Sequence, residues 1–544
     1  MEAQPQQRTR PSLHLLVIVT ISIASVAGYA AVIVAGRSHG YEADKMVAAR
    51  DLGFLFVIVV LFFWLVRRQK YKGEMLLLSS AVLLFAAGSL MQYRLFSDPE
   101  YGARGTARTH ARQLKDYAVR MRNIETAYDD TKKQFMFGAA IGTEQSQLQD
   151  LEARQKTSVN IFTSENTYIP LAAFVLLAIG FLIFRREETL LWFQRHSLII
   201  GVVTMIPFAL AVLLFSEEGK FLGQTTPWEP VKILFLLSFA GALANTYRQL
   251  RRTRWGVPPF RDLMPFGVIA AMPVIPFFAL SDFGQMMVFF GVYILLYIVA
   301  VRKKIQIAYG VLLVASIFGV FLIASKARTG LILPSRVYFR FYMWRNTWDP
   351  PPPDTAWWKH DFDHYLKAKG LDANDQDQDE LNRVNREAWS DKVLQQSQGL
   401  FGVSEGRIFG KGYGLGYPET IPISDSDFIY AAVSEESGLL GGLAILIAVA
   451  AFVIAGTGVS LNSSDMFTKL IAAGLTGFIG FQAIVNIGGV LRLLPMTGIT
   501  LPFVSHGGWS LMTSFAMLGI LMALSHRSFK EKQVQVEQRR EIPA

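Results

Sequence analysis

The sequence predicts an all-α polytopic membrane protein, and three observations support this fold class. Hydrophobic residues make up 51% of the 544 residues. Apolar runs repeatedly reach the ~20 residues that a helix needs to cross a bilayer. Short loops separate these runs, and Lys and Arg concentrate in every second loop, which is typical of cytoplasmic loops. A large soluble core would instead need helices that are apolar on every side throughout the chain.

Twelve spans are predicted in chain order. Their approximate bounds are 13–35, 51–67, 74–92, 167–185, 197–215, 230–248, 263–280, 284–301, 304–325, 427–455, 466–489 and 505–525. The first span follows a short polar segment with Arg8 and Arg10. Its apolar run is longer than that of a cleavable signal peptide, so we expect it to remain as an uncleaved span.

The basic loops assign one side of the membrane. They are residues 67–72, 185–186, 248–261 and 302–304, together with the polar N-terminus and the tail after residue 525. We therefore expect both termini in the cytoplasm. The formal net charge of +10 follows from these loops, so it reflects topology rather than a nucleic-acid-binding face. The chain has no Cys, which excludes disulfides, thiolate metal sites and Cys nucleophiles.

Two long segments then fall on the opposite side. Residues 93–166 are mixed in charge, and a solvated helix is predicted near 109–133. Residues 326–426 contain four consecutive Pro from Pro350, an acidic insert near 372–380 and several Trp. Loops of this length are usually functional or disordered. We expect ordered ends and a mobile middle near 355–385.

Ionisable residues in or beside spans indicate function, because their burial in a membrane is costly. Glu229 and Lys232 share one helix face at the start of a span, where an interfacial ion pair is the simpler interpretation. Asp282, in a turn between two spans, is interpreted first as a helix N-cap. Glu435 and Glu436 lie about two turns inside a span, so they need partners or water.

The segment 486–510, NIGGVLRLLPMTGITLPFVSHGGWS, lies between the last two spans. It combines an Arg, two Pro and Gly-Gly pairs, which predicts a folded loop that lines a cavity, since irregular backbone cannot face lipid.

Together these motifs resemble the SEDS (shape, elongation, division and sporulation) family, the FtsW/RodA type of peptidoglycan polymerase. The closing motif of that family resembles residues 493–510, and its "HTDFIFA…GEELG" motif resembles residues 425–438. Three shorter motifs of the family match more weakly, at Pro227, Glu229 and Lys232, at Asp282 and Gly284, and at the glycine-rich run 410–416. All of these motifs follow the order of the family from about residue 200 to 525. His506, Trp228 and Asp425 depart from the usual family residues.

The resemblance implies a bundle of ten core helices, to which this chain adds about two N-terminal spans. The domains are then 1–73 for the added spans and 74–325 for the first part of the core, which includes the loop 93–166. The catalytic loop is 326–426, the last core spans are 427–525, and the tail is 526–544.

The resemblance also implies glycosyl transfer from lipid II, a disaccharide-pentapeptide on a lipid diphosphate. A carboxylate base would activate the acceptor hydroxyl, and cations would stabilise the diphosphate leaving group. The family base lies in the large extracytoplasmic loop. Asp349 is the first candidate because it keeps a Trp-Asp-Pro context after an Arg-rich run, Asp354 is the second and Asp391 the third.

The same resemblance suggests substrate-binding residues. The candidates for holding diphosphate or lining the central cavity are Glu229, Lys232, Arg336, Arg340, Lys411, Asp427, Glu435, Glu436, Arg492 and Ser505. Asp427, Glu435 and Glu436 would line the central cavity, where they either hold a metal ion or pair with Lys232 or Arg492, and the sequence leaves both alternatives open.

A divalent cation, Mg²⁺ or Mn²⁺, is compatible with this chemistry, and no organic cofactor is expected. The implied partner is a class B penicillin-binding protein, because the chain has no transpeptidase domain, and the implied location is the bacterial inner membrane. Two alternative functions use the same features: a flippase for lipid-linked precursors, and a non-catalytic scaffold for the penicillin-binding protein. Division, elongation and sporulation roles are not distinguished by the sequence.

Overall fold

The computed structural model describes residues 11–38, 43–97, 165–205, 228–251, 282–302, 335–371 and 377–541, with residues 259, 261, 305 and 308. Within these residues, nine helices are long and apolar enough to span a membrane. They are α1 (Pro11–Ser38), α2 (Lys45–Phe63), α3 (Leu76–Ser97), α6 (Glu165–Phe184), α9 (Trp228–Leu250), α11 (Phe283–Val301), α16 (Ile429–Asn462), α17 (Met466–Val490) and α18 (Gly508–Glu541).

These nine helices match nine of the predicted spans, so the fold class is confirmed. The span predicted at 263–280 lies outside the described residues, as do the span predicted at 304–325, apart from residues 305 and 308, and the part of the span 197–215 beyond residue 205. The predicted helix at 109–133 also lies outside them. Helix α18 continues to Glu541, so most of the predicted tail extends the last helix.

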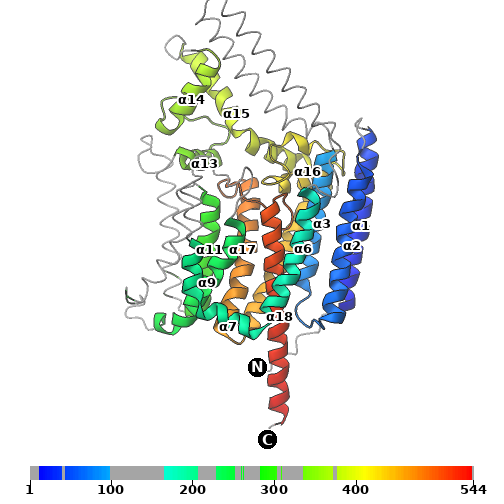
Figure 1. The fold of residues 1–544 in the computed structure, drawn as a ribbon. Coiled ribbons are helices and arrows are strands. Elements are labelled where there is room, and N and C mark those ends of the chain that lie inside the picture. The colour runs from blue at the N-terminus through cyan, green and yellow to red at the C-terminus, as the bar shows by residue number, and fades with distance from the viewer. Residues whose placement is uncertain are drawn as a thin grey trace, which may run out of the picture.

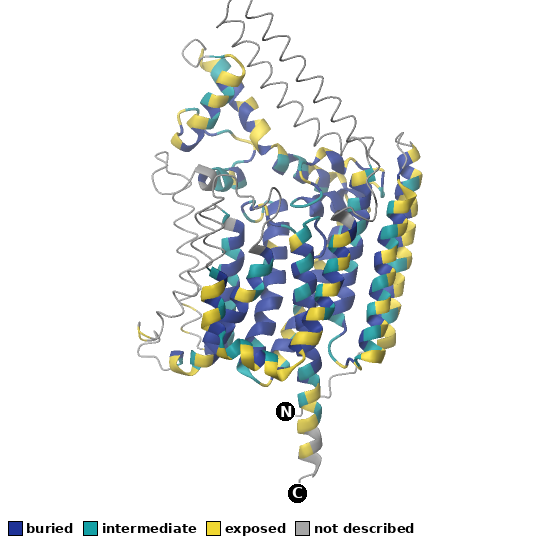
Figure 2. Cartoon of the chain, viewed as in Figure 1, coloured by how far each residue is buried: buried dark blue, intermediate teal, exposed yellow. Residues whose placement is uncertain are grey.

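The spanning helices form one bundle, with α17 at its centre and α1 and α2 at one edge (Figure 1). In the most apolar stretch, 89% of the residues of α17 are buried, compared with 28% for α1 and 33% for α2. Figure 2 shows the exposed residues of α1 and α2 along their outward surface. These exposed residues are largely apolar, as expected of lipid-facing helices.

Small residues bring the core helices into direct backbone contact. A Cβ on Gly519 of α18 would lie 2.1 Å from the carbonyl oxygen of Leu177 in α6. A Cβ on Gly88 of α3 would lie 2.2 Å from the carbonyl oxygen of Val504. Close approach of this kind is how membrane helices gain packing energy without a hydrophobic driving force between them.

The two ends of the bundle differ. The basic end carries the loops with residues 67–72 and 185–186, the short helix α7 (Glu187–Arg195), the start of α1 and the end of α18 (Figure 1). The opposite end, the subdomain end, carries α13 (Ser335–Arg345), α14 (Ala356–Ala368) and α15 (Gln378–Glu405). All described basic loops therefore lie at one end, as the charge pattern predicts.

Helices α13 to α15 form what we call the loop subdomain, which has its own aromatic core. Trp357, Trp358 and Trp389 are buried there together with Phe362. The indole of Trp358 donates to Asn385 Oδ1 (2.8 Å). The expectation of a mobile middle near 355–385 was therefore wrong for most of that stretch, because the tryptophans supply enough apolar area to fold it. Residues 372–376 lie outside the described residues.

Candidate functional site

Two half-buried carboxyl groups mark the subdomain end of the bundle. Asp282 is the N-cap of α11, as the sequence predicts, since its carboxylate accepts a hydrogen bond from Gln285 N (3.2 Å). Asp427 precedes α16, and its Oδ2 lies 3.4 Å from where a Cβ on Gly498 would be. Desolvation raises the pKa of Asp282, and desolvation together with Asp425 raises the pKa of Asp427 to about 6.

Arg340 on α13 is the cation that both carboxyl groups share. Its positive charge lowers the pKa of Asp282 and of Asp427, which partly offsets their desolvation. Its guanidinium donates to the carbonyl oxygen of Thr497 (3.3 Å). Arg340 therefore joins the loop subdomain, the closing segment 491–507 and the two acids. The side chain of Arg336 lies outside the described residues.

A small cavity adjoins Asp427. It is lined by Asp427, Asn486 and residues 496–499, and its volume is ≈ 10 Å³, which is room for about one water molecule. Asn486 closes one side, because its side-chain amide donates to the carbonyl oxygens of Asp427 (2.9 Å) and Ile499 (2.6 Å). Water at this position would reach the carboxyl group of Asp427.

Glu229 and Lys232 form a buried ion pair within α9. Lys232 Nζ donates to Glu229 Oε1 (2.7 Å) and to Gln482 Oε1 of α17 (3.3 Å), and Gln285 of α11 donates to Glu229 (3.2 Å). Lys232 has no exposed surface. The interfacial ion pair predicted from the sequence is therefore present, and it joins three helices below the carboxyl groups.

The closing segment 491–507 is held by its own polar residues. Ser505 Oγ donates to the carbonyl oxygen of Ser426 (2.6 Å) and accepts from Leu501 N (2.7 Å). Arg492 donates to the carbonyl oxygens of Trp344 and Arg345 (2.7 Å each), at the end of α13. Both candidate binding residues thus make backbone contacts that shape the site.

A second ion network was not predicted in this form. Arg94 near the end of α3 donates to Glu436 Oε1 (2.8 Å), to Glu419 Oε2 (3.2 Å) and to the carbonyl oxygen of Gly416 (3.0 Å). Arg94 and Glu436 are each 1% exposed. The alternatives that paired Glu436 with Lys232 or Arg492 were wrong, because those two cations contact Glu229 and the end of α13 instead. The missed signal was an Arg at the edge of an apolar run.

The glycine-rich run 410–416 packs on the start of α16. Lys411 N donates to the carbonyl oxygen of Glu435 (3.0 Å), and the carboxylate of Glu435 accepts from Tyr417 N (2.6 Å). A Cβ on Gly410, where φ is +81°, would lie 2.0 Å from the carbonyl oxygen of Glu436. The Lys411 side chain is 44% exposed and pairs with Glu405 (3.2 Å). This run therefore needs glycine to reach α16.

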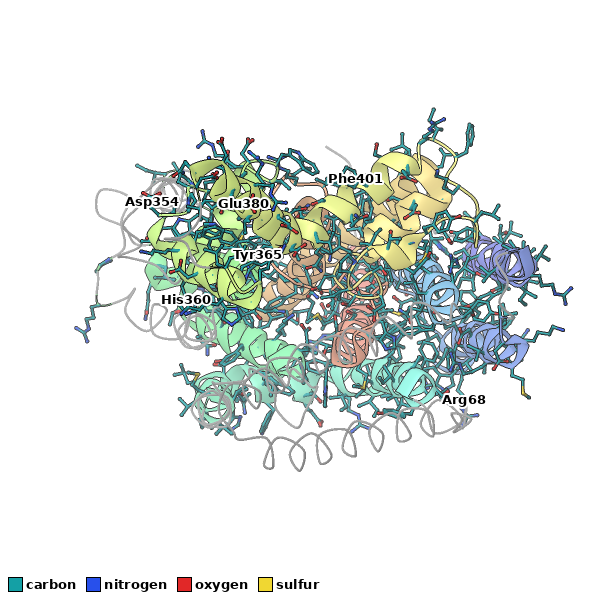
Figure 3. The ribbon with its side chains drawn as sticks, turned by 90° about the horizontal axis from the view of Figure 1, so that it is seen from above. Arg68, Asp354, His360, Tyr365, Glu380 and Phe401 are labelled. Atoms are coloured by element: carbon teal, nitrogen blue, oxygen red, sulfur yellow. The ribbon has the colours of Figure 1, made fainter. Side chains whose placement is uncertain are left out.

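The three candidate base residues lie on the loop subdomain with exposed carboxyl groups. Asp349 follows α13, where its negative charge adds to desolvation in raising the pKa of Tyr342. Asp354 lies at the periphery of the loop subdomain, just before α14 (Figure 3). Asp391 on α15 accepts a hydrogen bond from the hydroxyl of Tyr365 on α14 (3.2 Å). The three carboxyl groups thus have different neighbours within the loop subdomain.

This geometry can do two kinds of chemistry at the subdomain end. An aspartate with a pKa near 6 can exchange a proton at neutral pH, and an arginine shared by two acids can hold an anion. Among the described residues, no group of three His, Asp or Glu side chains is placed to hold a metal ion. The fold and this site define a multi-pass helical membrane protein with a charged site at one membrane surface.

Comparison with known proteins finds a family match in the C-terminal part of the chain. The FtsW/RodA/SpoVE family model, described as "Cell cycle protein", matches residues 380–530. Within these residues the chain is similar to the FtsW/RodA/SpoVE family, the SEDS family that the sequence motifs resemble. The matched region holds α15 to α18, Asp427, the two glutamates and the closing segment.

Two curated relatives match the same part of the chain. The chain is 44% identical over 129 residues to the peptidoglycan glycosyltransferase RodA of Mycobacterium tuberculosis, covering 24% of this chain and 28% of that protein. It is 37% identical over 145 residues to the stage V sporulation protein E of Bacillus subtilis, covering 26% and 40%. A chain from a solved peptidoglycan synthase complex aligns at a TM-score of 0.40 and 20% identity, covering 66% and 96%. The curated relatives are thus matched over less than half of their length.

Proposed function

We propose that this protein is a peptidoglycan glycosyltransferase that polymerises lipid II into glycan strands. The observation that supports this most directly is the charged site at the subdomain end, built from the segment 425–427, the closing segment and Arg340. The family region 380–530 contributes most of these residues. Its curated relatives bear the name peptidoglycan glycosyltransferase, which favours the same reaction class.

In the proposed reaction, a carboxylate of the loop subdomain removes the proton from the acceptor sugar hydroxyl as it attacks the anomeric carbon of the donor. The lipid diphosphate then leaves with the bonding electron pair. Asp349 remains our first candidate for this base, Asp354 the second and Asp391 the third. Their exposure is compatible with contact to a substrate that approaches from outside the lipid.

Cations would stabilise the leaving diphosphate. Arg340 is the first candidate because its charge acts on the carboxyl groups of both Asp282 and Asp427 and its guanidinium contacts the closing segment. Lys411 is compatible with the same role, since its ammonium group is partly exposed. Arg492 and Lys232 are better assigned to positioning, because their contacts hold α13 and α9 in place. Ser505 belongs with them, because it ties the closing segment to residue 426.

A divalent cation is compatible with the family chemistry, but the described residues supply no three-ligand cage for it. We therefore assign no step to a metal ion. We propose the bacterial inner membrane as the location, with the basic end and both termini in the cytoplasm. A class B penicillin-binding protein is the proposed partner, and it would crosslink the strands that this chain makes.

Two other functions make different predictions. A flippase would move a fluorescent lipid II analogue across proteoliposomes without lengthening it, and a scaffold would neither move nor polymerise it. The test is to incubate the purified full-length protein and its partner, inactivated in its transpeptidase, with labelled lipid II. A ladder of glycan strands supports the proposal. Translocation without a ladder would replace it with the flippase function, and the absence of both would favour a scaffold.

A further inference from the structure

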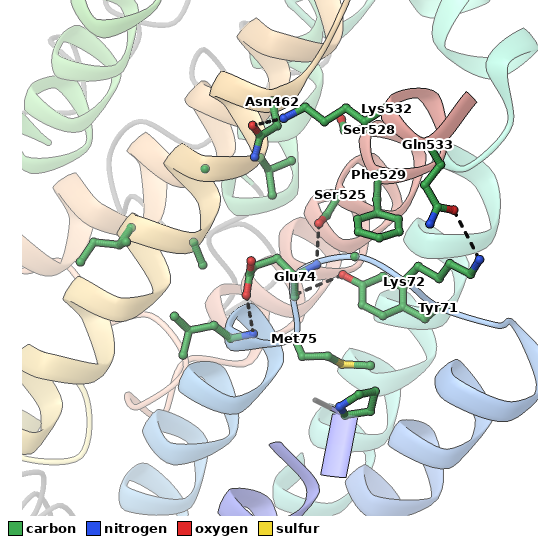
Figure 4. A pocket seen from close by; sticks show the side chains of 17 residues that line it. Tyr71, Lys72, Glu74, Met75, Asn462, Ser525, Ser528, Phe529, Lys532 and Gln533 are labelled. Atoms are coloured by element: carbon green, nitrogen blue, oxygen red, sulfur yellow. Dashed lines mark hydrogen bonds between the residues drawn. The ribbon is translucent and has the colours of Figure 1, made fainter. Parts of the chain in front are cut away.

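A cavity of ≈ 700 Å³ opens at the basic end of the bundle, and Figure 4 shows the side chains that line it. We call it the basal pocket. Its walls come from Pro11 at the start of α1, residues 71–76 at the start of α3, residues 454–462 near the end of α16 and residues 525–533 of α18. This volume lies within the range of binding sites for small amphiphilic molecules.

One wall of the basal pocket is apolar and continuous with the lipid-facing surface. Met75, Val459 and Phe529 line its interior, and Ile454 on the same wall is 68% exposed. Ile454 lies within a membrane span, so this exposed surface faces the bilayer. A Cβ on Gly458, beside it, would meet no atom within 4 Å. The pocket therefore opens sideways toward lipid acyl chains.

The other end of the pocket is cationic. Lys72 Nζ donates to Gln533 Oε1 (3.4 Å), and Lys532 Nζ donates to Asn462 Oδ1 (2.5 Å). These partners are neutral amides, and both lysines contact solvent. Glu74 also lines the pocket, and its backbone N–H donates a hydrogen bond to Ser525 Oγ (2.7 Å). Two ammonium groups against one carboxylate leave a net positive charge where the helices leave the membrane.

We propose that the basal pocket binds an anionic glycerophospholipid from the adjacent leaflet. The phosphate would lie between Lys72 and Lys532, and the upper part of an acyl chain would lie along Ile454 and Val459. A free anion would gain nothing from the apolar wall, and an uncharged lipid would gain nothing from the lysines. Basic pockets between helices at a membrane surface are a recurring means of holding anionic head groups.

The lipid would join α3, α16 and α18, and the first two of these helices also carry the buried ion network. Helix α3 carries Arg94, and α16 carries Glu436, at the opposite end of the same two helices. Helix α18 begins directly after the closing segment. A lipid held between α3, α16 and α18 would therefore stabilise the arrangement on which the charged site depends, because a ligand that binds only the folded state stabilises it.

The test measures lipid binding by the full-length protein in detergent, without lipid II or partner. Native mass spectrometry would record retained dioleoylphosphatidylglycerol, with dioleoylphosphatidylcholine and inorganic phosphate as comparison probes. The double variant Lys72→Gln/Lys532→Gln removes both charges, and Lys530→Gln is its control on an exposed lysine of α18 outside the pocket lining. The variant Gly458→Leu fills the pocket.

Gly53→Leu is the control for the filling variant, because a Cβ on Gly53 also meets no atom within 4 Å but lies outside the pocket. We expect phosphatidylglycerol to be retained over phosphatidylcholine. The double lysine variant should bind it about thirty-fold more weakly, at roughly a five-fold loss per lysine. Gly458→Leu should abolish retention, and both controls should behave as wild type.

Three results would overturn the proposal. Equal retention of the two lipids would show that charge does not select the ligand. Unchanged binding in the double lysine variant, or in Gly458→Leu, would show that the lipid lies elsewhere. Displacement of phosphatidylglycerol by millimolar inorganic phosphate would reduce the pocket to an anion site. Thermal unfolding of each variant without added lipid identifies any variant that fails to fold. If either the double lysine variant or Gly458→Leu fails to fold, lipid binding by the remaining one of the two tests the proposal.

Discussion

Removing Arg94 is the perturbation with the largest expected effect on stability. The change is Arg94→Met, which keeps the apolar stem and deletes the guanidinium. It leaves Glu436, with 0% side-chain exposure, without its 2.8 Å ion-pair partner. Breaking a buried pair by removing one partner costs about 3–5 kcal/mol.

A second estimate gives a similar magnitude. A buried carboxylate that loses its partner can instead bind a proton, which costs about 1.4 kcal/mol for each pH unit above its ordinary pKa. At pH 7 this limits the loss from Glu436 to about 3.7 kcal/mol. The contacts with Glu419 and Gly416 add about 1–2 kcal/mol. We therefore expect Arg94→Met to lose about 5 kcal/mol at pH 7, and about 2 kcal/mol less at pH 5.5.

The assay is unfolding of the purified protein in mixed micelles titrated with SDS. The double variant Arg94→Met/Glu436→Gln should recover part of the loss, because it removes the stranded charge. Lys411→Met deletes a cation from an exposed pair and should leave the midpoint unchanged. If Arg94→Met unfolds at the wild-type midpoint, or if the double variant is no more stable than the single one, the buried ion network does not hold α3 to α16.

Three further predictions concern the charged site and its supports. Because the pKa of Asp427 is raised from 3.8 to about 6, its carboxyl makes the folded protein less stable as pH rises from about 4 to 6. Asp427→Asn should therefore remove this pH dependence of the unfolding free energy and stabilise the protein by at most about 3 kcal/mol at pH 7. SDS titration at several pH values measures both effects. Arg492→Ala removes two hydrogen bonds from the end of α13, so limited proteolysis should cut the loop subdomain sooner while the bundle stays intact. Gly414→Ala should lower the unfolding midpoint, because φ at this position is +84° and the added Cβ would lie 2.6 Å from the Cβ of Ala35 in α1. Gly458→Ala is its control and should leave the midpoint unchanged, because a Cβ there meets no atom within 4 Å.

The sequence predicted the parts of this fold that depend on local pattern. Apolar length located the nine described spanning helices, and the N-cap at Asp282 followed from its position before an apolar run. The pairing of Glu229 with Lys232 followed from their three-residue spacing on one helix face. Each of these features is decided within a few residues, so each can be inferred without the rest of the fold.

The missed features depend on contacts between distant segments. Arg94 and Glu436 are 342 residues apart, and only the packing of α3 on α16 brings them together. The contact of Arg492 with α13 depends on a left-handed backbone at φ 58° that directs its side chain toward that helix. The fold of the loop subdomain likewise depends on tryptophans from α14 and α15 that meet in one core, a contact that the acidic composition near residues 372–380 does not indicate.

In the proposed function, an acid of the loop subdomain acts as the base in lipid II polymerisation. The most direct measurement is the rate of glycan growth from labelled lipid II by the purified protein with its partner. Wild type is compared with Asp349→Ala, Asp354→Ala and Asp391→Ala, each checked for wild-type unfolding. We expect one variant, first Asp349→Ala, to lose at least 100-fold in rate while still binding lipid II. Wild-type rates in all three variants would contradict the account.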